Sequence, residues 1–377
     1  MANRYYVWWT ADWNWTAWTK WSTTSGWAGG SSVPWAGDDV FFDANSTGTV
    51  TIIATVNCRN ITCTGFTWTI NFEDQFATLF VYWSVVLSST MTWWGLEATI
   101  FLLWTWSNTL TFAWWDLQDV YVYFWYSGAG GSWTLQDSIN CPDTFFIVDK
   151  WTFDTGWNDI ICNSLTTSGT YTNALTLWAS EITCDTFTVN SSTTFSGASS
   201  TIVSLWTFSG GGKTYWTLSL QGATNSVSGS NTFTTIQTIA WTYPTEISIT
   251  WTQTVANFNV NGDSANRIIL YWGHTLVKSN STDVNVSYLD IYNSTVTPSD
   301  TWYADDGTNI DGGGNTGWAF PIWTPRVQPT NEDSLYSTNI QSTNPRYYTY
   351  SPLIQPWDLW YFIYADNWNT PNWTSRS

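Results

Sequence analysis

The chain has 377 residues and a net charge of −18, with only ten lysine and arginine residues. A nucleic-acid-binding surface needs clustered positive side chains to neutralise phosphates, so this composition argues against a nucleic-acid partner. β-Branched and aromatic residues, which suit pleated strands, are abundant, whereas the strong helix formers Glu, Lys, Arg and Met are scarce. We therefore expect an all-β protein.

Residues 1–47 are rich in aromatic residues, glycine and aspartate, and we predict that they form an N-terminal cap. The first residues contain no apolar run, so we expect no cleaved secretion signal. The most apolar stretch, Ala77 to Leu87, is too short to cross a bilayer, and we expect no membrane insertion.

Residues 48–300 show short runs of alternating apolar and polar residues separated by Gly, Asn, Ser and Asp, a pattern typical of strands with one buried face. A longer period lies on top of this alternation, because Cys141, Cys162 and Cys184 are 21 and 22 residues apart in similar local frames. A period near 20 residues predicts a solenoid of about a dozen coils. We expect a single-stranded, right-handed parallel β-helix, with an array of β-sandwiches as the alternative.

The three cysteines Cys141, Cys162 and Cys184 are predicted to form an internal column, one thiol above another. Their main interpretation is that of small buried apolar side chains. A zinc site is the alternative, but the chain has a single histidine and no C-x-x-C pair. A disulfide between adjacent coils is conceivable, although five cysteines leave at least one thiol unpaired.

Residues 301–320 are predicted to close the solenoid, and they contain an oxygen-rich stretch. Asp305, Asp306, Asn309 and Asp311 form a weak candidate for Ca²⁺, without the final glutamate of an EF-hand loop. The alternative is a turn stabilised by Asx side chains. The remaining residues, 321–377, hold seven of the eleven prolines and many aromatic residues, which favours an extended C-terminal arm.

Catalytic machinery is not evident in the sequence. A serine or cysteine nucleophile would need His274, the single histidine, which lies in a strand-like stretch. Glycoside cleavage needs two carboxylates about 5–10 Å apart, for which the candidates are Glu181 with Asp159 and Asp137 with Asp159. Carboxylates on an acidic surface are more often solvated, so we predict no enzyme and no cofactor.

Tryptophan is unusually frequent, with 33 residues in the chain. Many stand in clusters where a turn is expected, such as Trp8-Trp9, Trp93-Trp94 and Trp114-Trp115. Tight turns favour glycine over bulky residues. We therefore hypothesise that some of these tryptophans stand in place of other residues.

Several ordered blocks of the sequence resemble a known family. They are Arg4 to Val7, Asn14 to Gly26, Val33-Pro34, Asp38 to Asn45, Val56 to Phe66, Leu117 to Val120, Thr301 to Tyr303 and Asn315 to Trp318. Together they resemble Thr/Ser/Gly-rich proteins of tailed bacteriophages over about residues 1–320. The family pattern places glycine at Trp8, Trp9, Trp27, Trp114 and Trp115.

The resemblance implies a β-helical structural protein of the virion, such as a fibre, a spike or a head-attached appendage. We accordingly expect assembly in the host cytoplasm, exposure outside the cell on the virion, and contacts with other virion proteins and with sister subunits, a trimer being one such oligomer. The alternatives are a glycan-binding adhesin or depolymerase that contacts the host surface, and an extracellular filament subunit.

Overall fold

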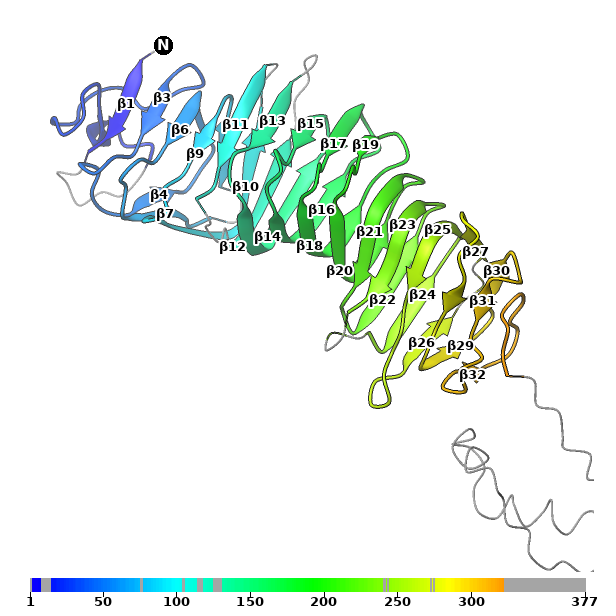
Figure 1. Cartoon of the computed structure of the whole chain (residues 1–377). Helices are drawn as coiled ribbons and strands as arrows, with labels where there is room; N and C mark the ends of the chain where they lie inside the picture. Colours follow the sequence, from blue (N-terminus) through cyan, green and yellow to red (C-terminus); the bar gives the residue numbers. More distant parts are fainter. Residues whose placement is uncertain are drawn as a thin grey trace, which may run out of the picture.

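The computed structural model describes residues 2–7, 15–74, 77–103, 106–113, 118–124, 131–239, 242, 244–271, 273 and 275–321. Within them the chain forms 32 strands and a single turn of 3₁₀ helix, η1 (Trp18–Lys20). The strands wind into a parallel β-solenoid of about 12 turns, which confirms the predicted fold class (Figure 1). The predicted arm, residues 321–377, lies outside the described residues except for Pro321.

The first sheet has ten strands in the spatial order β19-β17-β15-β13-β11-β9-β6-β3-β1-β2. All its pairings are parallel except that of β1 with β2. Its strands are β1 (Asn3–Tyr6), β2 (Trp21–Ser22), β3 (Asp39–Phe41), β6 (Asn60–Thr62), β9 (Val85–Val86), β11 (Ser107–Thr111), β13 (Ser132–Leu135), β15 (Trp151–Asp154), β17 (Asn173–Thr176) and β19 (Thr194–Ser196).

The second sheet contains twenty strands and runs along the whole rod. Its long strands bend, so that the first half of β20 pairs with β21 and the second half with β22. The strands are β4 (Val50–Ile52), β5 (Val56–Cys58), β7 (Thr69–Phe72), β8 (Thr78–Val81), β10 (Thr92–Leu102), β12 (Gln118–Phe124), β14 (Ile139–Val148), β16 (Ile160–Thr167), β18 (Glu181–Thr188), β20 (Thr201–Ser209), β21 (Thr214–Leu220), β22 (Thr224–Ser228), β23 (Thr232–Thr238), β24 (Glu246–Ile249), β25 (Thr252–Asn259), β26 (Ile268–Tyr271), β27 (Thr275–Lys278), β29 (Leu289–Ile291), β30 (Thr295–Thr297) and β32 (Ile310–Asp311).

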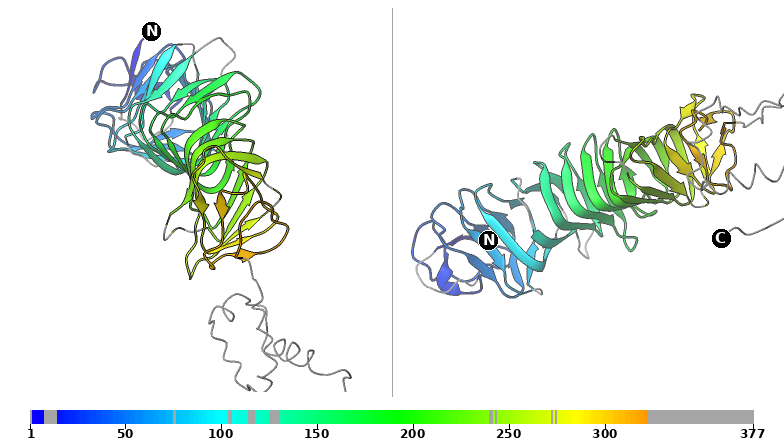
Figure 2. Two further views of the ribbon diagram at one scale, coloured as in Figure 1. Left: turned by 45° about the vertical axis from the view of Figure 1, so that its right-hand side comes forward. Right: turned by 90° about the horizontal axis from the view of Figure 1, so that it is seen from below.

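Both ends of the ladder extend into the segments predicted as cap and closure. Strand β3, in residues 1–47, pairs with β6, and β1 pairs with β3. At the other end β32 pairs with β29, and β28 (Val284–Asn285) pairs with β31 (Trp302–Tyr303) as a small third sheet. The terminal segments therefore continue the stacking of the central coils along the rod (Figure 2).

Period-two alternation places one face of each strand inside the rod. In β18 the inward residues Ile182, Cys184 and Phe187 are buried, whereas Thr186 and Thr188 between and beside them are half-buried on the outside. The same alternation in neighbouring coils builds one continuous apolar core from Tyr6 to Trp318. Each fully buried Leu, Ile or Phe side chain stabilises the fold by about 1.5–3 kcal/mol.

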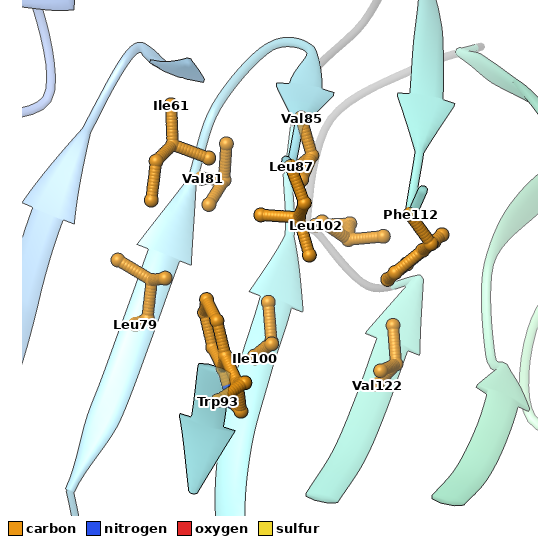
Figure 3. A pocket seen from close by; sticks show the side chains of 10 residues that line it. All are labelled: Ile61, Leu79, Val81, Val85, Leu87, Trp93, Ile100, Leu102, Phe112 and Val122. Carbon is orange, nitrogen blue, oxygen red and sulfur yellow. The ribbon is translucent and has the colours of Figure 1, made fainter. Parts of the chain in front are cut away.

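The core contains a small gap between the two sheets in the coils of β6 to β12. Ile61 and Val85 line it from the first sheet, and Leu79, Ile100 and Val122 from the second (Figure 3). All ten lining side chains are hydrophobic. Because it offers no polar group to orient a ligand, this gap is a packing feature of the core rather than a binding site.

Candidate functional site

The predicted cysteine column is present. Cys141 pairs with Cys162 and Cys162 with Cys184 in register, so the three residues occupy one position in successive coils of the second sheet. All five cysteines are buried, and none of them forms a disulfide. Cys58 and Cys63 lie outside this column, because Cys58 pairs with Val81 and Cys63 follows β6 of the other sheet.

Burial keeps the thiols of Cys58, Cys63 and Cys162 protonated. Burial raises the pKa of Cys162 well above its ordinary value, and the neighbouring Cys184 thiol raises it further. Burial also raises the pKa of Cys58 and of Cys63. The thiolate is the nucleophile and the metal ligand, so thiols held neutral in an apolar core act as packing groups.

The carboxylates proposed for glycoside cleavage contact backbone amides. Asp159 lies one coil below Glu181, and its Oδ1 accepts a hydrogen bond of 2.7 Å from the Glu181 amide. Asp137 accepts hydrogen bonds from the amides of Phe112, at 2.9 Å, and Ala113. Both aspartates therefore fix turns between coils, and Asp159 and Glu181 are the pair that the register brings together. His274 lies outside the described residues.

The oxygen-rich stretch near the end of the solenoid forms Asx-type turns. Asp306 Oδ1 accepts hydrogen bonds from the amide of Thr308 and from Asn309 Nδ2, and Asp311 Oδ1 accepts one from the amide of Gly313. Asn309 Oδ1 in turn accepts from the Leu289 amide of the preceding coil. Among the described residues no group of three or more His, Cys, Asp and Glu is arranged to hold a metal ion.

One outer face of the second sheet carries a feature that the sequence analysis did not identify. Six half-buried apolar or aromatic residues point outward from four successive coils, and we name them the aromatic strip: Phe80, Phe101, Tyr121, Tyr123, Phe145 and Ile147. Their rings stack along the rod, with centroid distances of 5.0 Å for Phe80–Phe101, 5.2 Å for Phe101–Tyr123 and 4.7 Å for Tyr121–Phe145. Burial is the first cause that raises the pKa of Tyr123, followed by Tyr121 and Asp149.

The same two columns continue down the rod as hydroxyl side chains. Below Phe145 and Ile147 the register places what we name the hydroxyl strip: Ser164, Thr166, Thr186, Thr188, Thr207, Ser209, Ser226 and Ser228. The two columns themselves contain no charged side chain, while Asp143 and Asp185 lie beside them in β14 and β18. The signal in the sequence is a pair of aromatic or hydroxyl residues two apart, which recurs at the coil period.

Comparison with known proteins yields no relative. No family model, no curated protein and no solved structure matches the chain. Among the described residues, no helix has both the length and the apolar character needed to cross a bilayer. The chain is therefore classified by its fold alone, as a parallel β-solenoid.

Proposed function

We propose that the chain is a structural subunit of a tailed-phage virion, in which the solenoid is a stiff spacer within a fibre, spike or appendage. The observation that carries the proposal is the apolar core that runs without interruption from Tyr6 to Trp318. A second support comes from the side chains that were candidates for catalysis or metal binding. Asp137, Asp159 and Asp306 form hydrogen bonds that hold turns and neighbouring coils. The residue blocks that resemble phage proteins give the proposal its biological setting.

Mass spectrometry of purified virions tests this role. Peptides of the chain should be present in many copies per particle, and labelled antibody should decorate an external projection in electron micrographs. Particles that are complete and infectious without the chain would contradict the proposal.

The partner that we propose for the aromatic strip is a second copy of the chain. The chain carries a net charge of −18, so two copies repel unless they meet through a surface without charge. The six residues of the aromatic strip are all uncharged, and their half-buried side chains bury a large apolar area when covered. Further sister subunits in the same arrangement would complete a trimer.

Light scattering on the purified chain tests this contact. The double substitution Phe101→Ser and Tyr123→Ser should reduce the oligomer to monomers. The control, Thr188→Ala and Ser209→Ala, alters the hydroxyl strip of the same face and should leave the mass unchanged. A wild-type chain that is monomeric at every concentration would exclude the strip as an interface between copies.

The second candidate is a glycan-binding or glycan-cleaving appendage. It is favoured by one observation, the exposed carboxylates Asp159 and Glu181 at equivalent positions of neighbouring coils. If they act on a glycan, Glu181→Gln should abolish cleavage of host capsular polysaccharide, while Glu246→Gln, a control outside the pair, should not. Wild-type protein that neither binds nor cleaves the polysaccharide would remove this candidate.

A further inference from the structure

Four tryptophans have backbone conformations that favour glycine. Their φ angles are 105° at Trp151, 72° at Trp157, 50° at Trp178 and 68° at Trp251. In this region the Cβ atom of an L-residue crowds the backbone, and for a bulky residue the conformation is an outlier. Half of the eight non-glycine residues with positive φ in the described chain are thus tryptophan.

Glycine occupies the equivalent position of a neighbouring coil in three of these cases. Thr254 pairs with Thr232, so Trp251 lies over Gly229, whose φ is 85°. Ile182 pairs with Ile160, which places Trp178 over Gly156, with a φ of 58°.

The third case is Trp151, which stands over Gly131 because Thr152 pairs with Ser132. The left-handed conformation is therefore repeated by a glycine of the neighbouring coil at two of these positions, Trp178 over Gly156 and Trp251 over Gly229.

The fourth case, Trp157, is explained by its turn. Residues 155–158 close a turn through the hydrogen bond from the Asn158 amide to the Thr155 carbonyl, at 3.0 Å. Its central residues, Gly156 and Trp157, have φ angles of 58° and 72°. The turn at 210–213 repeats this with Gly211 and Gly212, at 58° and 75°. Positive φ at both central positions selects glycine, above all at the second.

The side chains of these tryptophans contrast with those of the core. Trp157 and Trp251 are 65% and 67% exposed. Trp21 and Trp133, in contrast, are fully buried in strands, and their φ angles are not positive.

We propose that the protein as it is synthesised carries glycine at positions 151, 157, 178 and 251, and that the codon at each is UGA. UGA differs by one base from the glycine codon GGA and from the tryptophan codon UGG, and reassigned genetic codes read it as either amino acid. The core tryptophans Trp21 and Trp133 are then encoded by UGG. The inference bears on function, because with glycine at the corners there are no exposed indoles there on which a sugar could stack.

Peptide mass spectrometry of the protein from its native source, together with the gene sequence, tests this directly. We expect glycine and the codon UGA at positions 151, 157, 178 and 251. We expect tryptophan and the codon UGG at positions 21 and 133. Tryptophan in the four corner peptides, or UGG at the four codons, would overturn the proposal.

Recombinant protein with the printed sequence provides a second, physical test of the same positions. Trp157→Gly and Trp251→Gly should each raise the melting temperature, by on the order of 2 °C, because they relieve backbone strain and remove side chains that are largely exposed. The rise should be smaller for Trp157→Gly, which also removes the stacking of this ring on Trp178, at 5.2 Å between centroids. Trp133→Gly, the core control, should lower it strongly. A fall in melting temperature for both corner variants would show that tryptophan belongs at these corners.

Discussion

Neutral thiols in the core make the fold sensitive to alkaline pH. The folded-state pKa of Cys162 is raised, so the folded chain keeps a proton that the unfolded chain loses above its ordinary thiol pKa of about 8.5. The free energy of unfolding is therefore unaffected below that pH. It falls as the pH rises from the unfolded-state pKa towards the raised folded-state pKa, by about 1.4 kcal/mol per pH unit and thiol.

We predict that Cys162→Ala weakens this alkaline loss of stability. The measurement is the free energy of unfolding in urea, determined at neutral pH and at about one pH unit above the ordinary thiol pKa, for both the variant and the wild type. At neutral pH the variant should be less stable, because it leaves a small cavity. Equal pH dependence in variant and wild type would mean that the thiol is ionised or exposed in the folded chain.

Asn309 joins two coils through its side-chain amide. Its Nδ2 donates to the Val286 carbonyl at 2.7 Å, and its Oδ1 accepts from the Leu289 amide at 2.9 Å, both in buried surroundings. We predict that Asn309→Ala lowers the free energy of unfolding by about 1–3 kcal/mol, because both backbone groups lose their partner. Asn257→Ala, at an exposed site with one long hydrogen bond, is the control.

The variant Asn309→Ala also tests whether the stretch around Asp306 and Asn309 is a hydrogen-bonded turn or a calcium site. Melting curves with calcium and with a chelator should coincide for the wild type, because the oxygens of Asp306 and Asn309 already accept protein hydrogen bonds. A calcium-dependent rise in melting temperature that Asn309→Ala abolishes would identify a cation site instead.

The sequence predicts the position of the cysteines but not the role of the carboxylates. A column of like residues needs only a constant coil length, which the spacing of Cys141, Cys162 and Cys184 supplies. The partner of Asp137 is an amide at Phe112, in the previous coil, and depends on the conformation of both turns. No local pattern encodes such a contact.

At the scale of elements, Arg267 bridges three coils near the C-terminal end. Its guanidinium donates to Asp290 in β29, to the Leu289 carbonyl at 3.3 Å and to the Thr308 carbonyl at 2.6 Å. Strands at this end are short, as β32 has only two residues. Hydrogen bonds from the Arg267 side chain therefore hold these coils together where the strands form few backbone hydrogen bonds.

We predict that Arg267→Ala loosens this end of the solenoid before the centre. Hydrogen exchange should speed up in β29 and β32 while β14 to β18 stay protected, because coils contact only their neighbours. Lys213→Ala removes a single exposed hydrogen bond and should change exchange little. Uniform deprotection along the rod would indicate one cooperative unit.

Alternation in the sequence predicts which residues of a strand face inward, but not which coils pair at the ends. Strands β21 and β25, for example, lie within residues 48–300, where the alternation predicts short strands with one buried face. Strands β1 and β3 were not predicted. They pair in adjacent coils, but the loop between them makes their spacing longer than the coil period of about 20 residues. The aromatic strip was missed for a related reason, since outward residues carry no burial signal.

For the whole molecule, stacking makes the rod long and its stability additive along the axis. Such a rod suits the role of a spacer that we propose for the chain. The two surface strips distinguish one face from the others over much of the rod. That asymmetry is what lateral assembly with sister subunits requires.

The most direct measurement of the coil register uses disulfides between outward residues. Thr166 pairs with Thr188, and Thr188 with Ser209 in the next coil. Oxidation of the variant Thr166→Cys with Thr188→Cys should form a disulfide, because adjacent coils are about 4.8 Å apart, whereas Thr166→Cys with Ser209→Cys spans two coils and should not. Failure of the first pair to form a bond, or equal formation in both, would contradict a solenoid with successive coils in register.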